Sequence, residues 1–254
     1  MAREILFGGK RKVATAVFAM ALLALSSVYL SVAPFSRPLA LPDELVSLDS
    51  AEGLKLLETA ESTSDFEILD ATFAAQILST YCGVASAVMV LKASDIDAQQ
   101  TDFFIAGSPK IRDWARVAWR GMSLYDVSEH IRRFGAETQF QHIEDLSLDE
   151  FRTRVASVLG TPGQYMIVNY NRPVIDQHGS GHMSPLGAYN AASDMVLVMD
   201  TASYKYPKTW VPLPALYAAM LDSGSGGVVV VLGKKDPATQ ATLSMRSRSA
   251  RSAI

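Results

Sequence analysis

Residues 76–91 read QILSTYCGVASAVMVL, and this stretch decides what fold is expected. A polar loop gives way here to an apolar run that begins with Cys82 and Gly83. The residues that follow fit the spacing of a helix at Ala85, Val88, Met89 and Lys92. A lone cysteine is most often a small buried apolar side chain. At a helix start, however, free N–H groups and the positive end of the macrodipole favour a thiolate, so we predict that Cys82 is a nucleophile.

The composition of the 254-residue chain limits the other classes of function. It is 49% hydrophobic and 19% charged, which is typical of a globular protein with a sizeable core. The net charge of -3 disfavours nucleic-acid binding, which needs clustered basic residues. Because Cys82 is the single cysteine, an intramolecular disulfide and any zinc site with two or more thiolates are excluded.

Residues 1–33 have the pattern of an uncleaved signal anchor. Four basic residues lie near the start: Arg3, Lys10, Arg11 and Lys12. The uncharged run 13–33 would reach roughly 30 Å as a helix, enough to cross a bilayer core. By the positive-inside rule, we expect an inner-membrane anchor with the domain in the periplasm. The alternatives are a cleaved signal peptide with a soluble periplasmic domain, which Pro34 after a small-residue site disfavours, and a buried core helix.

The rest of the chain divides into a linker, one domain and a tail. Three prolines make 34–45 an extended linker, and 46–236 forms the predicted catalytic domain. Residues 237–254 are rich in Ser, Arg, Ala and Thr, so we interpret them as a disordered tail.

Helices precede strands within the predicted domain. Capping-box starts at Ser123 and Ser147 predict helices over 124–134 and 148–159. Short apolar runs then predict strands over 165–170, 183–189, 195–200 and 227–232. This order favours an α+β fold with two lobes, a helical lobe that carries Cys82 and an antiparallel sheet lobe.

A general base for the thiol must come from one of four histidines. We expect His130 to lie on the surface or in packing, and His142, at the end of a strand-like stretch, to be exposed. His178 and His182 share a glycine loop whose spacing suggests a metal pair, but it lacks an obvious third ligand, so we predict no metal site. His182 enters a strand from this loop and is the favoured base.

Asp200 is predicted to orient His182. A hairpin that turns about residues 191–192 puts His182 opposite position 200 or 202. Since side chains alternate with a period of two, both registers put His182 and Asp200 on the same face. The chain order Cys, His, Asp is also that of papain-like proteases, in which the third member is more often Asn.

These residues resemble the phytochelatin synthase family, whose fold is papain-like. The matching stretches are 76–91, GMSL at 121–124, VNYNR at 168–172, GSGHMSP at 179–185, Ala188-Tyr189 and DTASYKYPKTW at 200–210. By position, the resemblance implies Cys82 as nucleophile, His182 as base then acid, Asp200 as its orienter and Gln76 as an oxyanion donor. The residues expected to contact substrate are Gly83, Arg172, Gly181, Lys205 and Tyr206.

The resemblance also implies a reaction and its limits. The family cleaves glycine from glutathione through a γ-glutamylcysteinyl thioester, which water hydrolyses or a second glutathione accepts. With one cysteine, this sequence lacks the cysteine-rich domain of plant members, so we expect hydrolysis to dominate. No cofactor is expected, although thiol-binding cadmium or zinc could stimulate through the substrate. The family's arginine before the last strand is absent from 222–227, which makes Arg172 and Lys205 substitutes for holding the substrate carboxylate.

Two other readings stay open. One is a general cysteine peptidase for short peptides, and the other is a non-catalytic, metal-responsive module at a membrane. The complete set of Gln, Cys, His and Asp argues against the second. The sequence leaves the oligomeric state open, a homodimer included.

Overall fold

The computed structural model describes residues 15–24, 26–27, 38–104 and 113–233. Residues 15–24 and 26–27 are helical, but no helix in the described part of the chain is long and apolar enough to cross a membrane. The remaining residues of the predicted anchor, and the predicted tail, lie outside the described residues.

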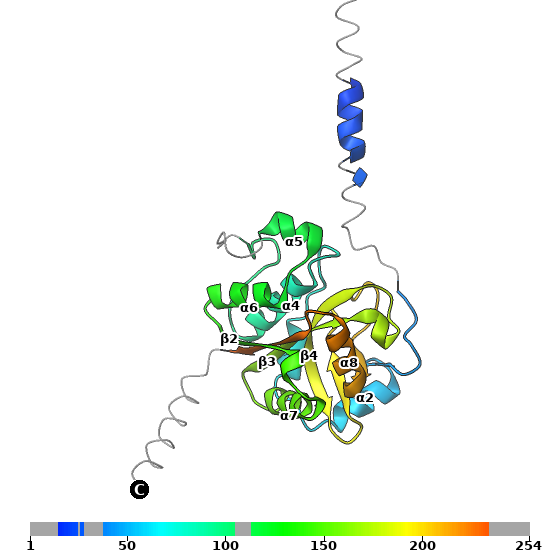
Figure 1. Cartoon of the computed structure of the whole chain (residues 1–254), viewed down its shortest axis with the longest axis vertical. Coiled ribbons are helices and arrows are strands. Elements are labelled where there is room, and N and C mark those ends of the chain that lie inside the picture. Colours follow the sequence, from blue (N-terminus) through cyan, green and yellow to red (C-terminus); the bar gives the residue numbers. More distant parts are fainter. Residues whose placement is uncertain (1–14, 25, 28–37, 105–112, 234–254) are drawn as a thin grey trace, which may run out of the picture.

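A seven-stranded antiparallel sheet runs through the described part of the domain (Figure 1). In spatial order the strands are β1 (Val46–Ser47), β6 (Thr209–Pro212), β5 (Met195–Val198), β4 (Gly181–Asn190), β3 (Gln164–Asn171), β7 (Gly227–Leu232) and β2 (Glu137–His142). The four predicted strands are confirmed as β3, β4, β5 and β7. β2 is the strand-like stretch that ends at His142, whereas β1 and β6 were not predicted.

Helices cover both faces of this sheet (Figure 1). They are α2 (Ala51–Glu58), α3 (Phe66–Ala71), α4 (Cys82–Ala93), α5 (Trp114–Arg120), α6 (Leu124–Arg133), α7 (Leu148–Leu159) and α8 (Leu213–Asp222). Ile167 and Val229 point into a core with α4 and α6, whereas their neighbours Val168 and Val228 point into a core with α7 and α8. Because successive side chains alternate, burial of both faces explains the unbroken apolar runs of β3 and β7.

The helix starts form as the sequence predicted. In both capping boxes the serine side chain accepts from the third backbone N–H, and the acid accepts from the serine N–H: Ser123 with Asp126, and Ser147 with Glu150. Gly135 follows α6 at a φ of 90°, the left-handed region that favours glycine. The α+β fold is confirmed, with α4 against β4 at its centre.

The described end of the predicted linker packs onto the domain, which corrects the expected boundary. The Leu39 N–H donates to the carbonyl oxygen of Lys205 at 2.9 Å. Leu45 is buried, and Leu41 packs against the same core. Pro42 begins a turn in which the Leu45 N–H donates to the Pro42 carbonyl oxygen at 3.0 Å, and this turn lets Leu41 and Leu45 bury against the same core.

Candidate active site

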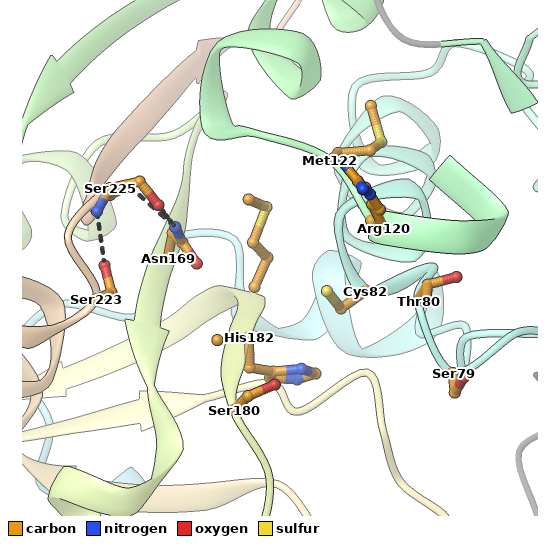
Figure 2. A pocket seen from close by; sticks show the side chains of 13 residues that line it. Ser79, Thr80, Cys82, Arg120, Met122, Asn169, Ser180, His182, Ser223 and Ser225 are labelled. Carbon is orange, nitrogen blue, oxygen red and sulfur yellow. Dashed lines mark hydrogen bonds between the residues drawn. The ribbon is translucent and has the colours of Figure 1, made fainter. Parts of the chain in front are cut away.

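Cys82 is the first residue of α4, and contacts on both sides of the first helical turn hold it in place. Tyr81 caps the helix through its backbone, and Ser86 Oγ bonds the carbonyl oxygens of Cys82 and Met183 at 2.8 and 3.2 Å. The second of these bonds ties α4 to β4, the strand that carries His182. The thiol and the imidazole are thereby held facing each other (Figure 2).

His182 bridges Cys82 and Asp200, as the sequence predicted. Its Nε2 lies 2.9 Å from Asp200 Oδ1. This leaves Nδ1 as the ring nitrogen for the hydrogen bond with the Cys82 thiol. A bulge between Leu186 and Ala188 shifts the register of β4 against β5, yet His182 and Asp200 still meet.

Arg172 lies beneath this pair, which corrects its expected role. The guanidinium is 2% exposed, and its Nη2 donates to Asp200 Oδ1 and Oδ2 at 2.8 and 2.7 Å. Its Nη1 donates to Gln177 Oε1. Because both terminal nitrogens already bond protein acceptors, the expectation that Arg172 holds a substrate carboxylate is wrong, and Arg172 positions Asp200.

The charges of this buried network favour a thiolate beside an imidazolium. Burial alone would raise the pKa of Cys82, but the hydrogen bond and charge of His182, with the Met183 and Gly83 N–H groups, lower it overall. Burial and Arg172 oppose the charged form of His182, yet Asp200 and Cys82 raise its pKa. Burial likewise opposes an ionised Asp200, but His182 and Arg172 hold its pKa well below the usual range.

Gln76 lies beside the loop that leads into α4. Its Nε2 donates to the carbonyl oxygens of Leu78 and Ser79 at 3.0 and 2.9 Å and lies 3.3 Å from Tyr204 Oη. Its backbone N–H donates to the carbonyl of Thr201, next to Asp200. Gln76 therefore connects the loop before Cys82 with the segment that follows Asp200. Its role as an oxyanion donor stays a prediction.

Three expected substrate contacts lie elsewhere than predicted. Gly83 is buried, and a Cβ there would lie 3.0 Å from Val127 Cγ2 and 3.1 Å from Met183 Sδ, so this glycine serves helix packing. Tyr206 is 1% exposed, and its hydroxyl accepts the His178 N–H at 2.8 Å. Lys205 is half-buried and does not line the cavity at Cys82.

A cavity of about 340 Å³ opens over Cys82 and His182 (Figure 2). Gly181 lines it, is exposed and has open space around its α-carbon, so it lies at the cavity as expected. Arg120 also lines the cavity, from the end of α5, and the sequence reasoning missed it. The one sequence signal for Arg120 is that it directly precedes the GMSL motif at 121–124.

The other histidines have structural surroundings. His130 is 2% exposed, with its ring 5.0 Å from that of Phe103, and His142 packs edge-on against Phe140. His178 is exposed on the loop before β4. In the described residues, no group of three or more His, Cys, Asp or Glu side chains is arranged to hold a metal ion.

A cysteine at a helix start, faced by a histidine on an antiparallel sheet and an aspartate just after one of its strands, defines a papain-like, cysteine-nucleophile protein. A family model described as phytochelatin synthase matches residues 36–226. The chain therefore belongs to the phytochelatin synthase family.

Curated relatives agree with this assignment. The chain is 30% identical to glutathione gamma-glutamylcysteinyltransferase 3 of Lotus japonicus, with 79% of this chain and 45% of that protein covered. It is also 30% identical to glutathione gamma-glutamylcysteinyltransferase 1 of Arabidopsis thaliana, with 80% and 45% covered. The chain thus spans less than half the length of these relatives.

Among solved structures, a putative C39-like peptidase from Bacillus anthracis is similar in fold, and the superposition covers 62% of this chain and 92% of the peptidase chain. The TM-score is 0.43, and the sequences are 15% identical.

Proposed function

We propose that the protein cleaves glycine from glutathione through a γ-glutamylcysteinyl thioester on Cys82. The observation that carries this proposal is that Cys82 and His182 line the cavity, with Asp200 bonded behind His182, in a chain of the phytochelatin synthase family. The curated relatives, whose names state this transferase activity, support glutathione as the substrate.

The first half of the reaction forms the thioester. The Cys82 thiolate attacks the carbonyl carbon of the Cys–Gly peptide bond, and the oxyanion that develops meets the Cys82 backbone N–H at the start of α4. Gln76 is proposed as the second donor, for which its Nε2 would exchange one of its carbonyl partners. His182 then passes its Nδ1 proton to the glycine nitrogen as the C–N bond breaks, and Asp200 holds the ring through Nε2.

The second half of the reaction releases the acyl group. Neutral His182 takes a proton from a water molecule, whose oxygen attacks the thioester carbonyl, and the thiolate leaves as γ-glutamylcysteine forms. Transfer to a second glutathione would lengthen the product to a phytochelatin. A cavity of about 340 Å³ is at the small end of ligand pockets. We therefore place hydrolysis first, with transpeptidation weaker and rising with glutathione concentration.

No cofactor takes part in this scheme, and metal ions are proposed to act through the substrate. Cadmium or zinc would stimulate transfer by masking the thiol of glutathione rather than by binding the protein. The test is S-methylglutathione, whose thiol is already blocked. Its turnover should be the same with and without cadmium, and stimulation by cadmium would contradict the proposal.

The experiment for the main proposal measures glycine release and product identity by liquid chromatography and mass spectrometry. We expect γ-glutamylcysteine and glycine as the main products at low glutathione, and none from Cys82→Ser. Phytochelatins as the main products at low glutathione would overturn the preference for hydrolysis. Comparable cleavage of unrelated short peptides would favour a general peptidase, and glutathione binding without turnover would favour a binding module.

Export to the periplasm behind an N-terminal anchor is a separate part of the proposal. It is supported by the basic start and the uncharged run 13–33. N-terminal sequencing of the mature protein should begin near Met1. A start near residue 34 or 41 would contradict the anchor and favour a cleaved signal peptide.

A further inference from the structure

The cavity over Cys82 has two unlike walls. Arg120 and Met122 line it from the helical side, whereas Asn169, Ser223 and Ser225 line it from the sheet side (Figure 2). No Asp or Glu of the described residues lines this cavity. The cavity is therefore polar and carries a positive charge at one wall.

Arg120 is the arginine that is free to bind a ligand there. It is exposed, and its guanidinium makes no hydrogen bond or ion pair with any described residue. Gly121 follows it at a φ of 68°, and its N–H donates to the carbonyl of Val117, so the chain turns sharply at the end of α5. This turn places Arg120, Gly121 and Met122 together at the cavity.

The opposite wall offers acceptors rather than cations. Asn169 Nδ2 donates to the carbonyl oxygen of Ser225 at 3.0 Å and to its Oγ at 3.2 Å. Because a carbonyl oxygen can only accept, these bonds settle which atom of the amide is nitrogen. The Oδ1 atom is left on the cavity side, where it can accept from a ligand (Figure 2).

A guanidinium across from an amide oxygen matches the head of an α-amino acid. The guanidinium pairs with a carboxylate, and the amide oxygen accepts from an ammonium group. In the peptide of the proposed function, the γ-glutamyl end carries both of these groups on one carbon, whereas the glycine end carries a carboxylate alone.

We propose that Arg120 binds the α-carboxylate of the γ-glutamyl residue and so selects peptides with a γ-linked amino-terminal residue. Asn169 receives the neighbouring ammonium group. This assignment rests on the proposed function, because it takes glutathione as the peptide that reaches Cys82.

The test compares Arg120→Gln with Arg116→Gln, which removes the same charge one turn earlier on α5. Arg116 is also exposed but does not line this cavity. For glutathione, Arg120→Gln should raise KM by about 10- to 100-fold with kcat changed less than about threefold, as for loss of a charge-assisted hydrogen bond. Arg120→Lys should recover part of the loss, and Arg116→Gln should leave KM unchanged. Unaltered circular dichroism and Tm in both variants would show that neither perturbs the fold.

Two substrate analogues identify the carboxylate. For 4-aminobutyryl-cysteinylglycine, which lacks the α-carboxylate, wild type should already show the raised KM, and Arg120→Gln should change it no further. For the glycinamide analogue of glutathione, the substitution should cost as much as for glutathione itself. Three results would each overturn the assignment. Arg120→Gln could raise KM equally for the analogue without the α-carboxylate, raise it only for peptides with the glycine carboxylate, or leave KM for glutathione unchanged.

Failure of the proposed function is distinguishable from failure of this inference. If wild type releases no glycine from glutathione, the proposed function fails. If wild type turns over glutathione and Arg120→Gln matches it, only the role of Arg120 fails.

Discussion

The arginine beneath His182 is buried and bonded through both terminal nitrogens, whereas the arginine on the helical wall of the cavity is exposed and unbonded. Arg172 is 2% exposed and donates to Asp200 and Gln177. Arg120 faces the cavity and pairs with no described residue. The same side chain therefore serves positioning in one place and is available for recognition in the other, and its burial and partners decide which.

The largest loss of activity should come from substitution of Cys82 or His182. Cys82→Ala removes the nucleophile, and His182→Ala removes the proton carrier, so each should lower the rate of glycine release by about 10⁴-fold or more. Because His142 and His178 lie outside the cavity lining, their alanine variants should keep the wild-type rate. An equal loss at either of them would mean that His182 is not the base.

Substitutions of the buried pair Asp200 and Arg172 should lower the activity less than those of Cys82 and His182, but should lower the stability more. Asp200→Asn and Arg172→Met each leave a buried charge without its partner, which should lower the free energy of unfolding by about 3–5 kcal/mol. Each should lower kcat by about 100-fold through the orientation of His182, with asparagine still able to bond the ring. Urea unfolding and steady-state kinetics measure the two effects.

The KM for glutathione separates Arg172 from Arg120. In Arg172→Met, KM should stay near its wild-type value, because the guanidinium does not reach the substrate. A large rise in KM with little change in stability would show instead that Arg172 binds the substrate.

The pH dependence of thiol alkylation should show how His182, on the sheet, changes the pKa of Cys82 at the start of α4. The pKa of Cys82 lies below the ordinary 9.0, and that of His182 above 6.5. The thiolate should therefore persist as pH falls below 9, and the reaction with iodoacetamide should show an inflection below that value. In His182→Ala the thiolate loses its hydrogen bond and cationic partner, so the inflection should rise. The same inflection in both proteins would contradict an ion pair.

The smallest effect should come from Gly83, which packs at the junction of α4, α6 and β4. In Gly83→Ala the added methyl group meets Val127 Cγ2 at 3.0 Å and Met183 Sδ at 3.1 Å. This crowding should lower the free energy of unfolding by about 1–2 kcal/mol and leave KM for glutathione unchanged. A raised KM with unchanged stability would restore Gly83 as a substrate contact.

The sequence predicted those features that depend on local signals. Capping boxes located α6 and α7 within a residue, and the polar-to-apolar change at Cys82 located α4. The approach of His182 to Asp200 was predictable because both hairpin registers put them on one face. The bulge in β4 was not predictable, yet it leaves that contact intact.

Features that depend on tertiary pairing were missed. β1 and β6 are short, with two and four residues, and each is a strand because it pairs with a neighbour, β1 with β6 and β6 with β5. Arg172 and Arg120 are indistinguishable as residue types, and only their surroundings separate a buried ion pair from an open side chain. The Arg120 position also depends on how α5 lies against the loop before α4, where Thr80 Oγ1 donates to the Ala118 carbonyl oxygen at 3.1 Å, and no local pattern reports this contact.

The most direct test of the central claim is the intact mass of the purified protein after brief exposure to glutathione and an acid quench. Wild type should gain the mass of one γ-glutamylcysteinyl group, and peptide mapping should place it on the peptide that contains Cys82. The adduct should be absent from Cys82→Ser and His182→Ala. Glycine release without any adduct on Cys82, or an adduct elsewhere in the chain, would contradict the account.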